Sequence, residues 1–182
     1  MSAEYGEKIA IALRAVYQLH SDTSRFLVDF DSKREGIGWK SVFGTVATSS
    51  ISVTLKAGYW MADGVYRYYT KPPALDIVEG LLVSFFHYQQ KSKEPLLLVA
   101  QIKYQAVGGS LIKDACKAWD IWELYYKWNE HQDLEKVIVS GPQDNGRIEW
   151  ARVLAVPLYS IKRVEDAEQL ITQVKRVPEN RD

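Results

Sequence analysis

The sequence predicts an α+β fold: a mainly antiparallel sheet built from hairpins, covered by a long N-terminal helix, a central aromatic-rich helix and a C-terminal helix. Two observations support this prediction. Apolar residues recur at spacings of three and four in three stretches of the chain, which is typical of helices with one apolar face. Between them lie short runs rich in Val, Ile, Thr and Tyr, and polar turn sequences separate these runs, which favours strands joined as hairpins.

The first helix is predicted from about Glu4 to Glu35. Its apolar residues share one face through a 3,4 spacing: Ile9, Ala12, Val16, Leu19, Phe26 and Phe30. Gly36 and Gly38 follow, and glycine commonly ends a helix because it adopts the left-handed turn that satisfies the last carbonyl groups. The Ser-Asp-Thr-Ser sequence at 21–24 favours a competing interpretation with a break, because these residue types prefer caps to helix interiors.

After this helix the pattern changes to that of extended chain. Thr45–Leu55 is rich in Thr, Val, Ile and Ser and is predicted to be extended. Glycines bracket Lys56–Gly64, so we expect a loop there. A strand is predicted at Val65–Thr70, and Pro72 and Pro73 end it because proline cannot donate a backbone hydrogen bond to a neighbouring strand.

The two strongest strand predictions are Ile77–Tyr88 and Leu96–Gln105. The polar sequence at 89–94 joins them, which predicts an antiparallel hairpin. The first strand is apolar at both alternations, and this favours a central position in the sheet. In the second strand, every other residue is polar from Gln101 to Gln105, so one face of the sheet is predicted to become polar there.

The rest of the chain is predicted to contain a second helix at about Leu111–Asn129 and a second hairpin. Its strands, Val137–Ser140 and Ile148–Leu158, flank Asn145-Gly146, a sequence typical of turns with positive φ. A helix at about Val164–Val177 closes the chain. No linker or internal repeat divides the sequence, so we expect residues 1–182 to form one domain.

Composition excludes several classes of protein. The chain has 182 residues, 47% hydrophobic and 25% charged, with a formal net charge of +0. Without a net positive field, general binding to nucleic acid is not expected. Cys116 is the single cysteine, so no internal disulfide forms and we expect a reducing, cytoplasmic location. We expect no signal peptide and no membrane span, because charged residues interrupt each apolar run before about 18 residues.

Polar residues on the two strongest strands suggest one metal-dependent chemistry. Asp76 and Glu79 lie at or near the start of one strand, and Gln101 and Lys103 lie two apart on the next. In outline this resembles the restriction-like nuclease core, in which carboxylates hold Mg²⁺ or Mn²⁺ and a lysine positions water. Gln101 replaces the leading carboxylate of that motif, and polar residues two apart are also typical of a solvent-facing strand. Apart from this alternative, no cofactor or metal is predicted.

The remaining polar candidates favour structural roles. His20, His87 and His131 have no partner at metal-ligand spacing, which favours buried or capping histidines. Cys116 falls among the packing residues of the second helix, which favours a core cysteine over a nucleophile. The glycines at 108–109, before Ser110, could present backbone amides to an anion, although such a pair is commonly a strand-to-helix turn.

Aromatic residues gather in two places. The first is Trp60 and Tyr66-Arg67-Tyr68-Tyr69, followed by Lys71; the second is the central helix, with Trp119, Trp122, Tyr125, Tyr126 and Trp128. Trp, Tyr and Arg are the usual anchors of protein interfaces. We therefore predict a non-enzymatic protein-interaction or regulatory domain that binds a partner or self-associates through an aromatic-rich surface: Trp60, Arg67, Tyr69, Trp122, Tyr125 and Trp128. A divergent nuclease and a small-ligand sensor remain the alternatives.

Overall fold

The computed structural model describes residues 3–46, 64–85, 94–105, 112–128, 133–142 and 146–178. Its centre is a six-stranded sheet with the order β1-β2-β3-β4-β6-β5, in which neighbouring strands are antiparallel. The strands are β1 (Lys40–Ser41), β2 (Gly64–Lys71), β3 (Ala74–Ser84), β4 (Leu96–Tyr104), β5 (Ile138–Ser140) and β6 (Ile148–Pro157). The helices are α1 (Ala3–Gly36), α2 (Ile112–Ala115), α3 (Asp120–Trp128) and α4 (Val164–Arg176). The predicted α+β class is confirmed.

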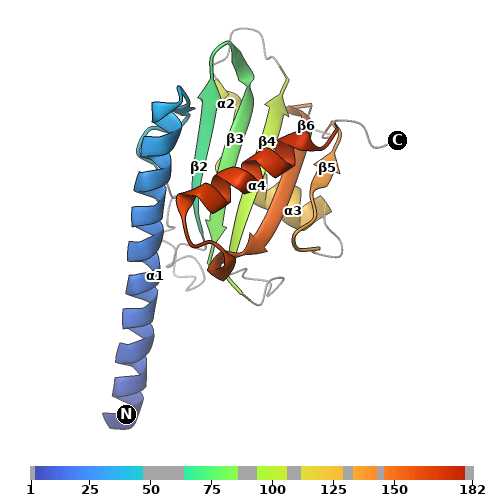
Figure 1. Ribbon diagram of the computed structural model, residues 1–182. Coiled ribbons are helices and arrows are strands. Elements are labelled where there is room, and N and C mark those ends of the chain that lie inside the picture. Colours follow the sequence, from blue (N-terminus) through green and yellow to red (C-terminus); the bar gives the residue numbers. More distant parts are fainter. Residues whose placement is uncertain are drawn as a thin grey trace.

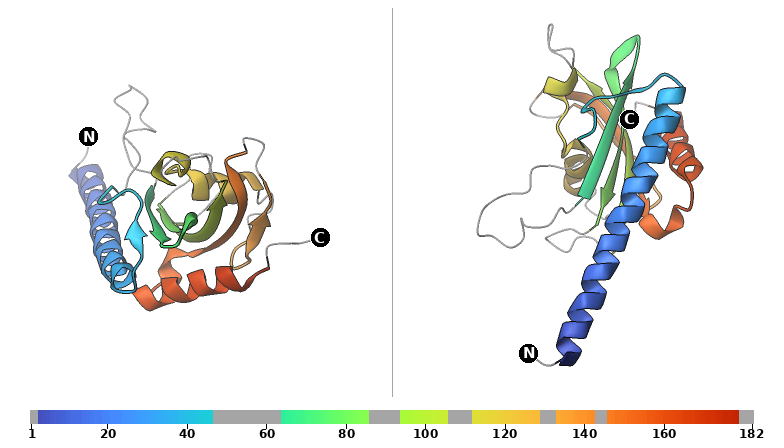
Figure 2. Two further views of the ribbon diagram at one scale, coloured as in Figure 1. Left: turned by 90° about the horizontal axis from the view of Figure 1, so that it is seen from above. Right: turned by 90° about the vertical axis from the view of Figure 1, so that its left-hand side faces the viewer.

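Helices cover both faces of the sheet, so the protein has two hydrophobic cores. Helix α3 lies on one face, where Ile121, Leu124 and Tyr125 pack against the strands. Helix α4 and the C-terminal half of α1 lie on the other face (Figures 1 and 2). The alternation of side chains along each strand supplies both cores, which is why β3 and β4 are apolar at nearly every position.

Most strand predictions are confirmed. β3 and β4 are paired, antiparallel and central, with Leu82 opposite Leu98. The second hairpin also forms, since β5 pairs with β6, and Gly146 has the positive φ of 62° expected for its turn. β1 was not predicted, and β3 begins earlier and ends earlier than predicted. Residues 47–63 lie outside the described residues, and with them most of the predicted extended segment Thr45–Leu55. Residues 86–93 also lie outside the described residues, and with them the predicted end of the first hairpin strand and the loop that follows it.

The first helix is continuous through residues 21–24, so the competing interpretation with a break is wrong. Thr23 within this sequence is buried on the helix face that meets the rest of the protein. Gly38 has a φ of 87°, as expected after a helix end. The helix has 34 residues, which makes it about 51 Å long. That is about three times the radius of gyration of roughly 16 Å that is expected for a compact domain of this length.

The prediction of one central helix over Leu111–Asn129 is wrong, because the chain forms two helices, α2 and α3, with a turn between them. The Asp120 carboxylate ends this turn: it accepts hydrogen bonds from the Lys117 backbone amide at 2.8 Å and from the Arg147 guanidinium at 2.7 Å. The Tyr68 hydroxyl sits in the same break, donating to the Ala118 carbonyl and accepting from the Ile121 amide. Contacts with Tyr68 and Arg147, which are distant in sequence, therefore start α3 at Asp120.

Candidate interaction surface

Helix α1 has two halves with different surroundings. Its C-terminal half packs on the sheet, where Leu27 and Phe30 are buried. Its N-terminal half extends beyond the body of the protein (Figures 1 and 2). Every residue from Glu4 to Ala15 is exposed, and the first buried residue of the helix is Thr23. We call residues 4–20 the projecting segment.

The projecting segment is apolar to an extent that is unusual for an exposed helix. Tyr5 is 55% exposed, Leu13 is 64% exposed and Tyr17 is 75% exposed. Among the nine residues from Ile9 to Tyr17, Arg14 is the one charged residue. A helix that is apolar around most of its circumference is normally covered by other structure. The segment therefore has the composition of a buried helix in an exposed position.

One apolar stripe runs along the full length of α1 with alternating spacings of four and three residues. We call it the α1 stripe, and its members are Tyr5, Ile9, Ala12, Val16, Leu19, Thr23, Phe26 and Phe30. Thr23 and Phe30 are buried against the body, whereas Tyr5, Ile9 and Ala12 are exposed. The same face of the helix thus meets its own sheet at one end and projects from it at the other.

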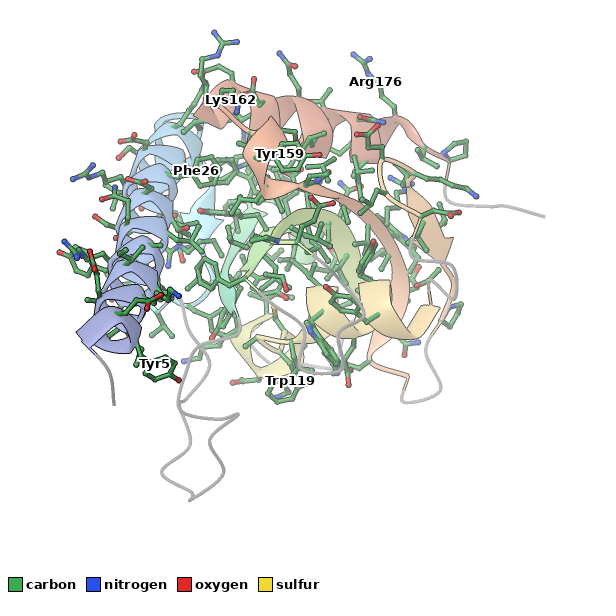
Figure 3. The ribbon with its side chains drawn as sticks, turned by 90° about the horizontal axis from the view of Figure 1, so that it is seen from below. Tyr5, Phe26, Trp119, Tyr159, Lys162 and Arg176 are labelled. Atoms are coloured by element: carbon green, nitrogen blue, oxygen red, sulfur yellow. The ribbon has the colours of Figure 1, made fainter. Side chains whose placement is uncertain are left out.

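A groove lies where the projecting segment joins the body. It has a volume of about 280 Å³, and its lining is mainly apolar: Leu19, Asp22, Thr23, Phe26, Val83, Leu158, Ile161 and Lys162. Figure 3 shows Phe26, Tyr159 and Lys162 on this side of the molecule, where α1 meets the start of α4. Tyr159, beside Leu158, is also exposed. The groove continues the apolar surface of the stripe onto the body.

In the first predicted aromatic cluster, Arg67 and Tyr69 form contacts inside the protein. The Arg67 guanidinium forms an ion pair with Asp31 of α1, with its Nε 2.9 Å from the carboxylate, and the Tyr69 hydroxyl donates to the same carboxylate. Arg67 also donates to the Gly44 carbonyl at 2.6 Å. Arg67 and Tyr69 are buried, so they attach α1 to β2. Trp60 lies outside the described residues.

The second predicted aromatic cluster is also largely internal. Tyr125 is buried, and Trp122 is half-buried with its ring 5.3 Å from that of Tyr126. Trp119 is exposed in the turn before α3, on the side of the molecule opposite α4 (Figure 3). Trp128 is the last residue of α3, and its side chain is outside the described part. The described aromatic residues of α3 therefore hold this helix to the sheet.

The four residues of the nuclease comparison are only partly brought together. Glu79 and Gln101 are cross-strand neighbours on β3 and β4, and Lys103 follows on the same face as Gln101. Asp76 is an odd number of residues from Glu79, which directs the two carboxylates of an extended strand to opposite faces. Among the described residues, no group of three or more His, Cys, Asp and Glu side chains is arranged to hold a metal.

Glu79 instead belongs to a buried polar network. Its carboxylate is fully buried and forms ion pairs with Arg34 of α1 and, at 2.7 Å, with Lys175 of α4. The Arg34 guanidinium also lies 4.1 Å from the Trp39 ring centroid. Gln101 accepts a hydrogen bond from Arg152 at 2.8 Å, and Lys103 forms an ion pair with Glu149 at 3.0 Å. The network joins both helices of this face to the central strands.

The other polar candidates are placed as follows. The His20 ring packs against Phe85, with the ring centroids 4.4 Å apart. Cys116 is a core cysteine, as predicted, and burial raises the pKa of its thiol to about 12. A protonated thiol is a poor nucleophile, so this group is chemically quiet at neutral pH. His87, His131 and residues 108–110 lie outside the described residues.

Comparison with known proteins identifies no similar protein. No family model, curated protein or solved structure matches the chain. In the described ranges, no helix is long and apolar enough to cross a membrane.

The sequence predictions missed the projecting segment as a surface, because they assigned its stripe to packing within the chain. Two signals point to it in hindsight. The helix is too long for the body to cover, and Ile11, Leu13 and Tyr17 are apolar residues that lie off the stripe.

Proposed function

We propose that this chain is a non-enzymatic protein-interaction domain that acts through the projecting segment of α1. The observation that carries the proposal is the exposure of the segment's large apolar side chains, including Tyr5, Leu13 and Tyr17. Contiguous apolar surface on a soluble protein is typical of an interaction site. We further propose that residues 1–182 act as one domain in the cytoplasm, in keeping with a single cysteine that is buried.

Helix energetics support this proposal. An isolated helix of fewer than about 15 residues is marginal in water, and packing of an apolar face supplies most of the stability of helices in proteins. From Glu4 to Ala15 the projecting segment is exposed, so most of its apolar surface lacks such packing, whereas Leu19 and His20 at its end contact the body. A partner helix would supply it, since each large apolar side chain contributes about 1.5–3 kcal/mol when fully buried.

The groove at the base of the segment supports the same conclusion. It lies between Leu19 and Phe26 of α1 and Leu158 of the connection to α4. A partner that follows the stripe toward the body would reach this groove and bury further apolar surface there. The interaction surface therefore combines a helix face with an adjacent concave site, which is a common mode of helix recognition.

The test is to replace two residues of the stripe. Ile9→Asp/Val16→Asp places two charges on the stripe seven residues apart, and Glu7→Asp/Arg14→Asp is the matched control, with the same spacing on the opposite side of the helix. We expect the stripe variant to lose a complex of defined stoichiometry, measured by light scattering and by affinity capture from the expressing cells, while the control keeps it. Equal complexes in the wild type and both variants would overturn the proposal.

A further inference from the structure

The α1 stripe has the period of a coiled coil. Its spacings of four and three residues repeat every seven residues, which keeps one seam of the helix facing a partner over several turns. Five of its members lie in the projecting segment, and the sixth, Thr23, lines the groove. The seam is therefore continuous with the contact that α1 already makes with its own sheet through Phe30.

This continuity decides how a second copy could pair. From Thr23 onward the seam is buried against the chain's own body, and the half-buried Leu19 already packs on it, so the body of each copy lies on the side of α1 that a partner helix would approach. In a parallel pair, both bodies would occupy the space between the two helices at the same level. In an antiparallel pair, each body lies at the N-terminal end of its partner's helix. The bodies exclude the parallel arrangement and permit the antiparallel one.

One antiparallel register pairs the six members of the stripe from Tyr5 to Thr23. Antiparallel coiled coils pair the two kinds of seam position with each other. Phe26 and Phe30 pack on the chain's own sheet, so the longest overlap left for a second copy runs from Tyr5 to Thr23 and sets Ala12 opposite Val16 at its centre. The next layer on either side sets Ile9 opposite Leu19, and the outermost sets Tyr5 opposite Thr23. The small Ala12 permits close approach at the centre. The large Tyr5 meets the small Thr23 at the groove, so a small side chain opposes a larger one in the central and the outermost layers.

The positions that flank the seam suit the same register. On one side Lys8 meets Asp22 of the second copy, and two-fold symmetry makes this pair twice. Both side chains are exposed in the single chain, at 70% for Lys8 and 58% for Asp22, and within α1 they form surface ion pairs with Glu4 and Arg25. On the other side Leu13 meets its own symmetry mate, which covers one of the most exposed apolar residues of the helix. Ala15 lies on the same side of the seam as Lys8 and Asp22, and it also meets its own symmetry mate.

We propose that the partner of the projecting segment is a second copy of this chain, bound as an antiparallel two-helix coiled coil about a two-fold axis between Ala12 and Val16. The proposal rests on the proposed function and names its partner. Each copy inserts its Tyr5 at the other's groove, beside Thr23, so that the interface extends from the helices onto both bodies.

The register is tested by cross-linking in the full chain. Ala15→Cys places two thiols at the symmetry axis, and a short bismaleimide should link them, because paired helix axes lie about 8–10 Å apart. Ala10→Cys is the matched control on the outer face of the helix and should stay unlinked. The native Cys116 is buried and does not interfere. Linking through Ala12→Cys in place of Ala15→Cys would indicate a parallel pair and overturn the proposal.

Charge reversal provides a second test that leaves the stripe intact. Lys8→Glu sets two like-charged pairs against Asp22 and should raise the dimer dissociation constant about tenfold, and Asp22→Lys in the same chain should restore it. Failure of the double variant to restore association would overturn the register. Analytical ultracentrifugation over a range of concentrations measures both effects.

The outcomes separate this inference from the proposed function. A wild-type chain that stays monomeric at every concentration, yet loses a complex with a different protein when Ile9 and Val16 become Asp, overturns the second copy as partner and leaves the proposed function standing. A dimer that is insensitive to that stripe variant overturns both. A dimer lost in the stripe variant and linked through Ala15→Cys supports both.

Discussion

Replacing Glu79 should be among the most destabilising single changes in this protein. Glu79 is fully buried on β3, and Arg34, its partner on α1, is buried too. Glu79→Gln keeps the size of the side chain and removes the charge, so the Arg34 guanidinium remains in the interior without a counter-ion. Breaking a buried ion pair from one side costs about 3–5 kcal/mol. Small domains have a total unfolding free energy of about 5–15 kcal/mol.

The structure also predicts how this loss is relieved. Arg34→Met removes the buried charge in the same region with a side chain of comparable reach, so Glu79→Gln/Arg34→Met should lose only about 1–3 kcal/mol. Arg34→Met alone, which leaves the buried Glu79 carboxylate with Lys175, should cost at least about 2 kcal/mol. The sum of the two single losses should therefore exceed the loss of the double variant by at least about 2 kcal/mol. Lys175→Met is the matched control, because Lys175 is 43% exposed and its charge stays hydrated; we expect a loss of about 1 kcal/mol or less.

Urea unfolding followed by circular dichroism measures these free energies, provided that the slope with denaturant is unchanged among the variants. The reasoning is refuted if Glu79→Gln costs less than about 1 kcal/mol. It is equally refuted if the double variant loses the full sum of the single losses, because the two charges would then act independently.

Two further changes test the interior. A Cβ atom on Gly80 would lie 2.7 Å from Ile121 Cδ1 and 2.8 Å from Tyr68 Cδ1, so Gly80→Ala should cost about 1–3 kcal/mol in urea unfolding, and an unchanged stability would contradict the close packing of α3 on β3. The Cys116 thiol, with its pKa raised by burial to about 12, should resist a thiol reagent at pH 8 until urea unfolds the chain. Rapid labelling of the native protein would contradict the burial of the thiol. Because the folded pKa lies above the ordinary value of about 9, the thiol's contribution to stability is complete below pH 9 and falls as the pH rises toward about 12.

The sequence predicted those parts of the fold that depend on local pattern. The apolar runs of β3 and β4 identified the central strands, because a strand covered on both faces must be apolar at both alternations. The break between α2 and α3 was missed because its cause is distant in sequence. Asp120 ends the turn through Arg147, and Tyr68 of β2 occupies the break. Neither contact has a signal within the helix itself.

The functional surface was harder to predict, because a sequence pattern does not show what covers it. The spacing of apolar residues in the α1 stripe is the same where the stripe meets its own sheet, as at Phe30, and where it meets solvent, as at Ile9. The same holds for Glu79, whose position on a strand suggested a metal site. Its two partners, Arg34 and Lys175, are far away in the sequence and come from helices on one face of the sheet.

The buried polar contacts and the exposed stripe of α1 act together. Asp31 pairs with Arg67 of β2 and Arg34 pairs with Glu79 of β3, so two charged residues within one helical turn attach α1 to two neighbouring strands. Polar pairs of this kind require one geometry, whereas apolar contacts tolerate sliding. They fix the direction in which the projecting segment leaves the body. A helix held in a fixed direction loses less conformational entropy when a partner binds. Loosening the Arg34–Glu79 pair should therefore weaken association through Ile9 and Val16 as well as stability.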